Sequence, residues 1–252
     1  MDFKRAFRVW QRNATVYKKL YRSSLTLNFF EPMLYLIALG YGLGGFIKEI
    51  NGMTYIEFIA PGIIMSSAMF AACYECTYGT YVRMVYQKTF DAILATPITF
   101  NELILGELLW GATKSLIYGT VIILVISLFG LVKSSYVVFL IPLILMCGLI
   151  FASLSLIATA IVPGIDSFNY FYTLILTPLF LFSGIFFPLE DMPEIVIKLS
   201  QANPLMHLVN ISRAFCYGKI PYSFIYDLIV IVIYLFVLAP FPFILLKKRY
   251  VL

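Results

Sequence analysis

Long apolar runs follow one another along this chain, with short polar segments between them. An α-helix needs about 20 mostly apolar residues to cross a bilayer. Six runs meet that length and predict six spanning helices: 24–47, 56–81, 104–132, 137–162, 167–187 and 223–246. The pattern therefore predicts an all-α integral membrane protein, with residues 1–252 forming a single transmembrane domain.

The first 22 residues combine basic side chains with apolar anchors such as Phe3, Phe7, Trp10 and Tyr17. Basic helices with aromatic anchors lie along a membrane surface, held by headgroup charge and buried apolar area. We therefore expect residues 1–22 to form an amphipathic interface helix. They do not fit a short signal peptide. A solvated basic tail is the alternative.

The composition supports the membrane assignment. Of the 252 residues, 62% are hydrophobic and 12% are charged, whereas soluble domains are about half apolar and about a quarter charged. Nucleic-acid binding is not expected in so apolar a chain. The pair Cys73 and Cys76 lies inside an apolar run, and His207 is the only histidine, so helix packing is a better interpretation than a metal site.

Lysine and arginine are unevenly divided between the two predicted faces. Twelve lie on the side of the termini: Lys4, Arg5, Arg8, Arg12, Lys18, Lys19, Arg22, Arg83, Lys88, Lys247, Lys248 and Arg249. Five lie on the other side: Lys48, Lys133, Lys198, Arg213 and Lys219. Because cytoplasmic loops carry the excess of these residues, both termini and the 82–103 loop are expected in the cytoplasm.

The 82–103 loop contains a short amphipathic segment, YQKTFDAILAT, at 86–96. Phe90, Ile93, Leu94 and Pro97 follow helical spacing and form one apolar stripe. Thr89 is expected to cap this helix, with Asp91 near its positive end, and Pro97 to end it. Thr99 or Asn101 would cap the next helix. The stripe predicts contact with a partner protein, with contact to lipid as the alternative.

Four charged residues fall inside the predicted spans, in the half nearer the cytoplasm: Glu31, Glu75, Glu107 and Lys114. Such charges are costly in a bilayer and call for partners or a cavity. Aromatic side chains lie beside them: Tyr74, Tyr78 and Trp110. One hypothesis is a polar, aromatic-rimmed vestibule for a sugar-like headgroup. The other is that the acids pair with Lys114 and Arg83 and fix helix packing.

The sequence contains no phosphate-binding loop, since the single Gly-Lys pair, Gly218-Lys219, is followed by Ile220 rather than Ser or Thr. Any ATP-driven work would therefore need an ATPase on another chain.

Several stretches resemble the permease subunits of type-2 ABC exporters, and more closely the NodJ-like branch of lipo-oligosaccharide exporters. The stretches are FEPMLYLIALGYGLG (30–44), YIEFIAPGIIMSSAMFAACYECTYGTYVRM (55–84), TFDAILATPIT (89–99), GELLWGATK (106–114), SGIFFPLEDMP and NPLMHLVNISRA (within 183–214). The resemblance implies six spans, an interface helix, a cytoplasmic coupling helix at about 86–96 and an outer re-entrant hairpin within Ser183 to Pro221. It also implies that two permeases pair with two ATPase subunits and that the permease has no catalytic residue.

Residues 188–222 fit such a hairpin, because prolines divide them into short, partly apolar segments at 193–202 and 204–217. Polar backbone at membrane depth must be buried in protein or line a cavity. The candidate outer gate comprises Phe187, Pro188, Pro204, His207, Asn210 and Arg213. His207, Asn210 and Arg213 repeat every three residues, which predicts a shared wet face; a satisfied interfacial histidine is the alternative.

The resulting hypothesis is a multi-pass permease of a bacterial cytoplasmic membrane that exports a lipid-linked glycan or lipo-oligosaccharide. Its partners would be a second copy of itself, two ABC ATPases that hold ATP and Mg, the lipid bilayer and an amphiphilic substrate. The chain itself would hold no cofactor or metal. The alternatives are export of a hydrophobic drug or antibiotic, a lipid-modifying membrane enzyme, and a passive channel.

Overall fold

The computed structural model describes the backbone of residues 2–47, 49–50 and 52–251, and all side chains in these ranges except those of 20, 22–29, 31 and 251. The described α-helices are α1 (Phe3–Ile37), α2 (Tyr55–Tyr74), α3 (Thr89–Leu94), α4 (Phe100–Leu128), α5 (Leu140–Ile161), α6 (Phe168–Phe171), α7 (Thr177–Leu181), α8 (Glu194–Ser200), α9 (Pro204–Tyr217), α10 (Phe224–Leu238) and α11 (Phe241–Val251). The π-helical turns are η1 (Ala38–Gly42), η3 (Glu75–Gly79), η4 (Val82–Tyr86) and η7 (Tyr172–Leu176). The 3₁₀ turns are η2 (Leu43–Gly45), η5 (Ser135–Phe139), η6 (Ile165–Ser167) and η8 (Leu189–Asp191).

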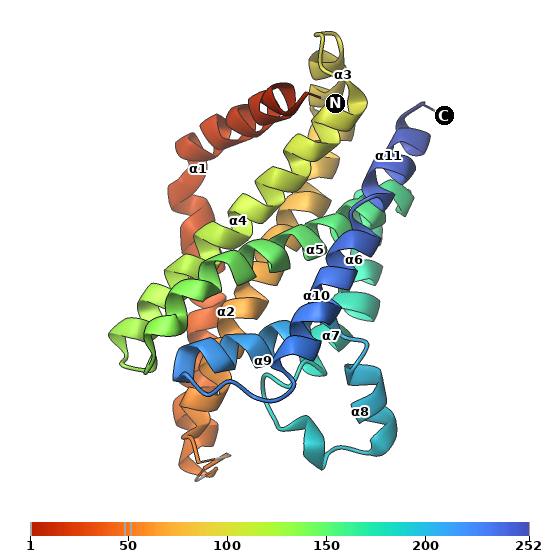
Figure 1. Ribbon diagram of the computed structural model, residues 1–252. Coiled ribbons are helices and arrows are strands. Elements are labelled where there is room, and N and C mark those ends of the chain that lie inside the picture. The colour runs from red at the N-terminus through yellow and green to blue at the C-terminus, as the bar shows by residue number, and fades with distance from the viewer. Residues whose placement is uncertain (1, 48, 51, 252) are drawn as a thin grey trace.

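The elements form a bundle with two distinct ends (Figure 1). At one end lie the N-terminal arm of α1, the short helix α3 and the C-terminal end of α11. Helices α8 and α9 and their loops lie toward the opposite end. Helix α1 changes direction along its length, so its first part crosses the top of α4 while its later part descends along the bundle. Both terminal segments therefore lie at the same end of the bundle, as expected for a chain that crosses the membrane an even number of times.

Four of the predicted spans are confirmed as helices long and apolar enough to cross a bilayer: Tyr55–Tyr86, Phe100–Leu128, Ser135–Ile161 and Phe224–Tyr250. The first predicted span corresponds to a shorter apolar helix at Pro32–Gly45, within the described residues. The fifth corresponds to the consecutive short elements α6, η7 and α7. The count of six spans stays a prediction.

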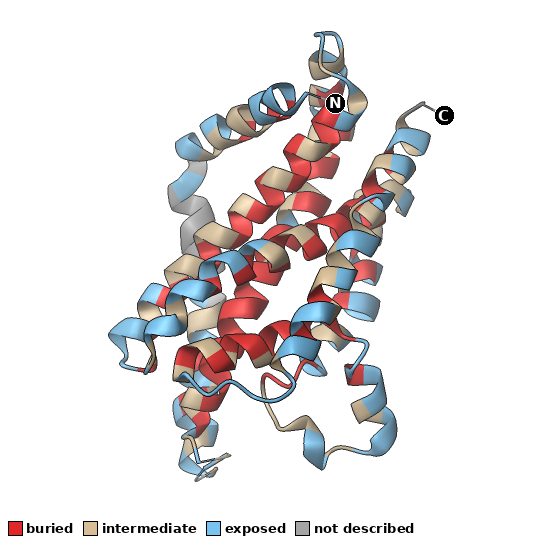
Figure 2. Ribbon diagram, viewed as in Figure 1, coloured by how far each residue is buried: buried red, intermediate tan, exposed pale blue. Residues whose placement is uncertain are grey.

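Helix α2 is the centre of the bundle, and most of its side chains are buried by the rest of the chain (Figure 2). Helices α4 and α5 pack against it and against each other. By contrast, α10 exposes most of its apolar surface. In a bilayer this apolar surface faces lipid or another subunit, since no water is present to disfavour it.

Small residues let the central helices approach closely, as in other membrane bundles. A Cβ atom at Gly111 of α4 would lie 2.4 Å from Cys76 Sγ and 3.0 Å from Ala152 Cβ of α5. A Cβ atom at Gly106 would lie 2.5 Å from Val9 Cβ, so this glycine allows the α1 arm to rest on α4. These positions fix where α2, α4 and the arm meet.

Helix α9 stabilises a proline-interrupted turn of α2. Pro61 has no N–H, so the carbonyl of Glu57 loses its partner within the helix. The hydroxyl of Tyr217 donates to that carbonyl at 2.6 Å. The guanidinium of Arg213 donates to Phe58 O at 3.2 Å, and Ser212 Oγ donates to Pro61 O at 3.0 Å. Tyr217 of α9 thus satisfies the carbonyl that Pro61 leaves open, and Arg213 and Ser212 bind two further carbonyls of the same turn.

The predicted short helix at 86–96 is present but shorter, as α3. Lys88 precedes it in the left-handed region, with φ 53°, and offers no side-chain cap. Thr89 is the first helical residue rather than the cap, so that expectation was wrong. Thr99 caps α4 as predicted, and it forms a reciprocal pair with Glu102, whose carboxylate accepts from Thr99 N at 2.8 Å.

Candidate transport site

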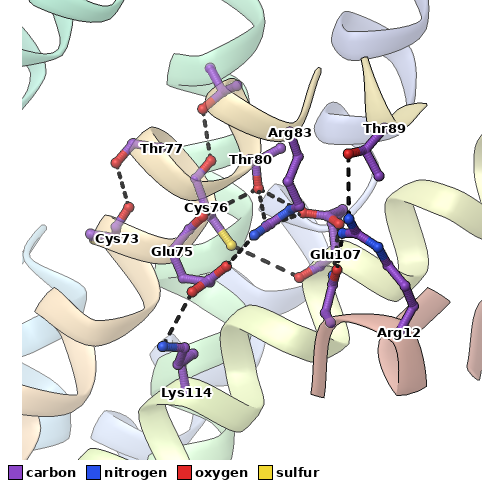
Figure 3. A network of polar contacts seen from close by, with 12 residues as sticks. Arg12, Cys73, Glu75, Cys76, Thr77, Thr80, Arg83, Thr89, Glu107 and Lys114 are labelled. Carbon is purple, nitrogen blue, oxygen red and sulfur yellow. Dashed lines mark hydrogen bonds and ion pairs between the residues drawn. The ribbon is translucent and has the colours of Figure 1, made fainter. Parts of the chain in front are cut away.

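Four charged side chains form one polar network, two from the turns η3 and η4 that continue α2 and two from α4 (Figure 3). Arg83 donates from Nη1 to Glu75 Oε1 and from Nη2 to Glu107 Oε2, both at 2.6 Å. Lys114 Nζ lies 3.4 Å from Glu75 Oε2. One guanidinium therefore bridges two carboxylates, and one carboxylate bridges two cations. Removing any member would leave a buried charge without compensation.

Glu107 is the most enclosed member of this network, with its side chain 1% exposed. Besides Arg83, it accepts from Asn13 Nδ2 of α1 and from Thr80 Oγ1, both at 2.8 Å. Three donors from two other segments, the α1 arm and the helical continuation of α2, thus converge on one carboxylate. Its role in this arrangement is to hold α1, η4 and α4 together.

A cavity of about 430 Å³ opens beside the network, which we call the vestibule. It is lined by Arg12, Asn13, Val16, Tyr17, Glu75, Tyr78, Gly79, Val82, Arg83, Gln87, Trp110 and Lys114. Its volume is within the usual range for small-molecule sites, and its walls combine aromatic rings with a few convergent charges. The N-terminal arm of α1 supplies one wall.

The local backbone explains how Glu75 and Arg83 come together, eight residues apart. The helix continues beyond α2 through the π-helical turns η3 and η4, which alter the ordinary angular spacing of side chains. Gly79 lies between Glu75 and Arg83 in the sequence, and a Cβ atom at this position would lie 2.9 Å from Glu75 Oε1. A glycine at 79 therefore leaves the room that the ion pair occupies.

Lys114 is surrounded by aromatic rings as well as by acid. Its ammonium lies 4.0 Å from the Tyr17 ring centroid, 5.6 Å from that of Tyr118 and 5.8 Å from that of Trp110. Aromatic faces attract cations by their quadrupole, most strongly where water is excluded. These rings hold the ammonium at the wall of the vestibule.

A row of aromatic rings extends from the vestibule toward the other end of the bundle; we call it the aromatic ladder. Its successive ring centroids are 5.0–6.2 Å apart, and its members are, in order, Tyr78, Tyr172, Tyr74, Phe70, Phe180 and Tyr35. The side chains of Tyr74 and Tyr35 are 41% and 39% exposed, so the ladder has an open face. A hollow beside it is lined by Pro32, Tyr35, Phe70, Tyr74, Phe180 and Phe186, among others.

The structure brings together most of the residues predicted for the cytoplasmic-side path. Glu75, Glu107, Lys114, Trp110 and Tyr78 meet at the vestibule. Tyr74 lies on the aromatic ladder instead, stacked on Tyr172 at 5.0 Å. Glu31 lies outside the described side chains. The predicted pairing of the acids with Lys114 and Arg83 is present, and it coexists with a cavity, so the two hypotheses are not exclusive.

Sequence reasoning missed the contribution of the α1 arm to this site. Asn13 and Tyr17 lie four residues apart and Arg12 lies beside Asn13, so all three fall on one side of the arm. The available signal was an asparagine within a basic, aromatic helix. Its partner, Glu107, is 94 residues away, which no local pattern indicates.

The apolar stripe of α3 packs within this chain rather than facing outward. Phe90 is fully buried, and its ring centroid lies 6.4 Å from that of Tyr250 in α11. Ile93 and Leu94 are half-buried. Pro97, the last residue of the predicted stripe, is exposed. The other exposed side chains of the segment 86–97 are Tyr86, Gln87, Lys88, Asp91, Ala92, Ala95 and Thr96. The surface available to a partner therefore differs from the predicted stripe.

Helix α3 is attached to both terminal segments of the chain. Arg12 Nη2 donates to Thr89 Oγ1 at 3.4 Å, and Arg5 Nη1 donates to Pro97 O at 2.7 Å. The hydroxyl of Tyr250 donates to Asp91 Oδ1. A displacement of α3 would therefore pull on the α1 arm and on α11 together.

The opposite end of the bundle holds a larger cavity of about 730 Å³. Of the predicted outer-gate residues, Phe187, Pro188, Asn210 and Arg213 line it. Pro204 is instead buried at the first turn of α9, after the cap Asn203. The predicted segments at 193–202 and 204–217 are present as α8 and α9.

His207 does not share a wet face with Asn210 and Arg213, so that expectation was wrong. It is fully buried, with Nδ1 2.6 Å from Asp227 Oδ1 and Nε2 2.9 Å from Gln201 O. The alternative of a satisfied histidine is the one observed. The pair joins α9 to α10, because Asp227 belongs to the latter.

Among the residues whose side chains are described, no group of three or more His, Cys, Asp or Glu could hold a metal ion. The four cysteines are all buried and unbridged.

Comparison with known proteins places this geometry in context. Residues 5–217 match the family described as ABC-2 type transporter. The chain is 39% identical over 205 residues to Nodulation protein J of Sinorhizobium fredii, covering 81% of this chain and 78% of that protein. It is 37% identical to Nodulation protein J of Rhizobium meliloti, covering 84% and 80%. It is also 25% identical to the inner membrane transport permease YadH of Escherichia coli, covering 83% and 80%.

Proposed function

This chain belongs to the ABC-2 type transporter family and is the membrane permease subunit of an ABC exporter; we propose that its cargo is an amphiphile with a lipid tail and a glycan head. The names of the Nodulation protein J relatives are consistent with the lipo-oligosaccharide branch that the sequence resembles. The chain itself does no chemistry in this proposal, and ATP is hydrolysed by a separate subunit.

The aromatic ladder is the observation that carries the glycan assignment. Sugar rings present C–H faces and hydroxyl groups, and they stack on aromatic faces with polar edges nearby. Four of the six rings belong to tyrosines, and the ring centroids of three of these, Tyr74, Tyr78 and Tyr172, lie 5.0–6.4 Å from one another. A glycan moving along the ladder exchanges one ring contact for the next, while its acyl chain stays among lipid-facing side chains.

Coupling to ATP hydrolysis is proposed to act through α3. Its exposed residues Asp91, Ala92 and Ala95 form the docking surface for the ATPase, while Phe90, Ile93 and Leu94 fix α3 to its own chain. Tyr86 and Pro97 flank this surface. Movement of α3 reaches the vestibule through the hydrogen bond from Arg12 to Thr89. ATP then supplies the free-energy difference between states that the permease alone cannot provide.

The assembly is proposed to contain two copies of this chain and two ATPase subunits in the bacterial cytoplasmic membrane, with α3 and both termini on the cytoplasmic side. The open face of the ladder supports pairing of two copies, since a second ladder would close the path. The cavity at α9 is then the exit, with Phe187, Pro188, Asn210 and Arg213 at its wall.

The test is transport by the permease reconstituted with its ATPase in vesicles. We expect an acylated oligosaccharide to stimulate ATP hydrolysis and to appear in the opposite compartment, and we expect Tyr74→Leu to reduce both. A hydrophobic drug of similar size is the comparison substrate. Stimulation by the drug alone, with Tyr74→Leu indistinguishable from the parent, would replace the glycan assignment with drug export.

A further inference from the structure

The vestibule holds one more positive charge than its ion pairs neutralise. Among the described side chains, Arg12, Arg83 and Lys114 line it, and Glu75 and Glu107 are the carboxylates of its network. Arg83 and Lys114 both have carboxylate partners, at 2.6 Å and 3.4 Å. Three cations against two anions leave a net charge of +1.

Arg12 is the cation left over. Its hydrogen bonds go to neutral groups, Asn13 Oδ1 at 2.9 Å and Thr89 Oγ1 at 3.4 Å, and none of the described carboxylates lies within ion-pair distance. Burial, with the nearby Arg83 guanidinium, lowers the pKa of Arg12, and Glu107 only partly opposes this. An arginine nevertheless stays protonated in proteins, so Arg12 remains a half-buried cation that is available to pair with a bound anion.

A second donor beside the cavity also lacks a partner. Arg83 Nε is buried and has no hydrogen-bond acceptor among the described residues, whereas the terminal nitrogens of Arg83 donate to Glu75, Thr80 and Glu107. Buried polar groups without partners are uncommon and indicate a missing ligand or water. The vestibule therefore combines an uncompensated cation with an unused N–H group.

The remaining walls fit the uncharged part of such a ligand. Tyr17, Tyr78 and Trp110 present aromatic surface to the cavity, and Tyr78 is the first rung of the aromatic ladder. Val16, 44% exposed, lies on the arm that is expected to rest at the membrane surface. An amphiphile can therefore place its charged group at Arg12 while its tail remains in the bilayer.

We propose that the vestibule binds the anionic group of an amphiphile, a phosphate, sulfate or carboxylate, with Arg12 as its direct ligand. This deepens the proposed function, on which it rests for its link to transport, by assigning a negative charge to the head of the bound molecule. Because Arg12 also donates to Thr89 of α3, the bound anion competes for the guanidinium that ties the α1 arm to the coupling helix. Occupancy of the vestibule thereby reaches the surface on which the ATPase docks.

The chain carries its own reporter of this site. Its two tryptophans are Trp10 and Trp110; Trp110 lines the vestibule, and the two ring centroids are 6.5 Å apart. The experiment titrates the full chain, in phosphatidylcholine nanodiscs without ATPase, with octyl phosphate or octyl glucoside while tryptophan fluorescence is recorded. We expect a saturable change with octyl phosphate and a much weaker one with octyl glucoside, which has the same tail.

Two arginines of the same arm give a matched comparison. Arg12→Gln is expected to weaken octyl phosphate binding by about tenfold or more, the loss typical of one charge-assisted hydrogen bond. Arg8→Gln removes the same charge from an exposed position and is expected to leave binding unchanged. Arg12→Lys is expected to retain part of the affinity. A thermal melt of each variant confirms that it is folded.

Two additional titrations distinguish the sources of the anion. If inorganic phosphate binds as tightly as octyl phosphate, the site takes a free ion and the amphiphile assignment is overturned. If phosphatidylglycerol in the nanodiscs weakens octyl phosphate binding, the site is supported and its ligand is a bilayer lipid. If phosphatidylglycerol has no effect, the site is supported and its ligand is a transported amphiphile.

Equal responses to octyl phosphate and octyl glucoside, or equal losses in Arg12→Gln and Arg8→Gln, would overturn the anion site. Neither result depends on ATPase or on glycan movement, so failure here is separate from failure of the export proposal.

Discussion

At the residue scale, Arg83 is the central residue of the polar network, because its guanidinium bridges the carboxylates of Glu75 and Glu107. Its contacts with Glu75 and Glu107, both 2.6 Å, join α2's continuation to α4. Asn13 then connects the α1 arm to the same carboxylate. The same ion pairs and hydrogen bonds therefore hold the helices together and form the wall of the vestibule.

The first prediction concerns Arg83→Met. We expect it to lower the free energy of unfolding by about 3–5 kcal/mol, since it leaves two buried carboxylates without their shared cation. The double variant Arg83→Met/Glu107→Gln should lose less stability, because the second substitution removes one of the two carboxylates that would lack a cation. Thermal unfolding in detergent measures both. A single variant as stable as the parent would show that the network does not hold the helices together.

Glu75→Gln is expected to separate transport from assembly. Glu75 faces the vestibule, with its side chain 13% exposed, and bridges Arg83 and Lys114. A neutral amide keeps the size of the side chain but removes the negative charge that faces the head group of a bound substrate. Reduced export with normal co-purification of the ATPase is the expected result; export at the parental rate would remove Glu75 from the path.

At the scale of the elements, the structure depends on close approach of α2, α4 and α5. Gly111 lies where α4 meets Cys76 and Ala152. The proline turn of α2 in turn packs on α9, where Tyr217 donates to the carbonyl that Pro61 leaves open and Arg213 and Ser212 donate to two neighbouring carbonyls. Helix packing and backbone satisfaction thus come from different elements.

Gly111→Ala tests the close contact. Its added Cβ would lie 2.4 Å from Cys76 Sγ, so we expect a loss of about 1–3 kcal/mol in stability from overpacking. Gly42→Ala serves as the control, since its Cβ would meet nothing within 4 Å. The two melting temperatures are compared in the same detergent. Equal temperatures would mean that the helices can separate at little cost.

Helix α3 gives a prediction about coupling. Ala92 is exposed, so Ala92→Arg should leave the thermal stability unchanged and reduce ATPase-driven transport by obstructing the docking surface. Ala202→Arg makes the same change at an exposed position between α8 and α9, at the other end of the bundle, and should change neither the thermal stability nor transport. Phe90→Asp, by contrast, places a charge in a fully buried position and is expected to destabilise the chain itself. If ATPase-driven transport is normal in Ala92→Arg, then the exposed face of α3 is not the surface on which the ATPase docks.

At the scale of the whole molecule, function depends on which end of the bundle faces the cytoplasm. The basic arm, α3 and the C-terminal end of α11 gather at one end, and α8 and α9 lie toward the other (Figure 1). In the proposed function, the vestibule at the first end is the entrance of the export path and the larger cavity at the second end is its exit. This assignment of entrance and exit requires that the end of the bundle with the vestibule faces the cytoplasm.

Cysteine labelling checks that orientation. The four native cysteines are buried, so an impermeant thiol reagent should give little background. Ala92→Cys is expected to react only when the cytoplasmic face is accessible, and Tyr222→Cys, in a fully exposed loop, only from the outer face. Reaction of Ala92→Cys from outside in sealed cells would reverse the orientation and the direction of the proposed path.

The sequence by itself predicted the membrane character, four of the spans, a helix cap at Thr99 or Asn101, and the two short segments that form α8 and α9. These follow from apolar run length, capping residues and prolines, all of which act locally along the chain. Only the tertiary structure decided that Arg83 bridges Glu75 and Glu107, that Phe90 faces α11 rather than a partner, and that His207 pairs with Asp227. Such partners are brought together by packing across many residues, as with Asn13 and Glu107, and a hydropathy pattern carries no information about which helix faces which.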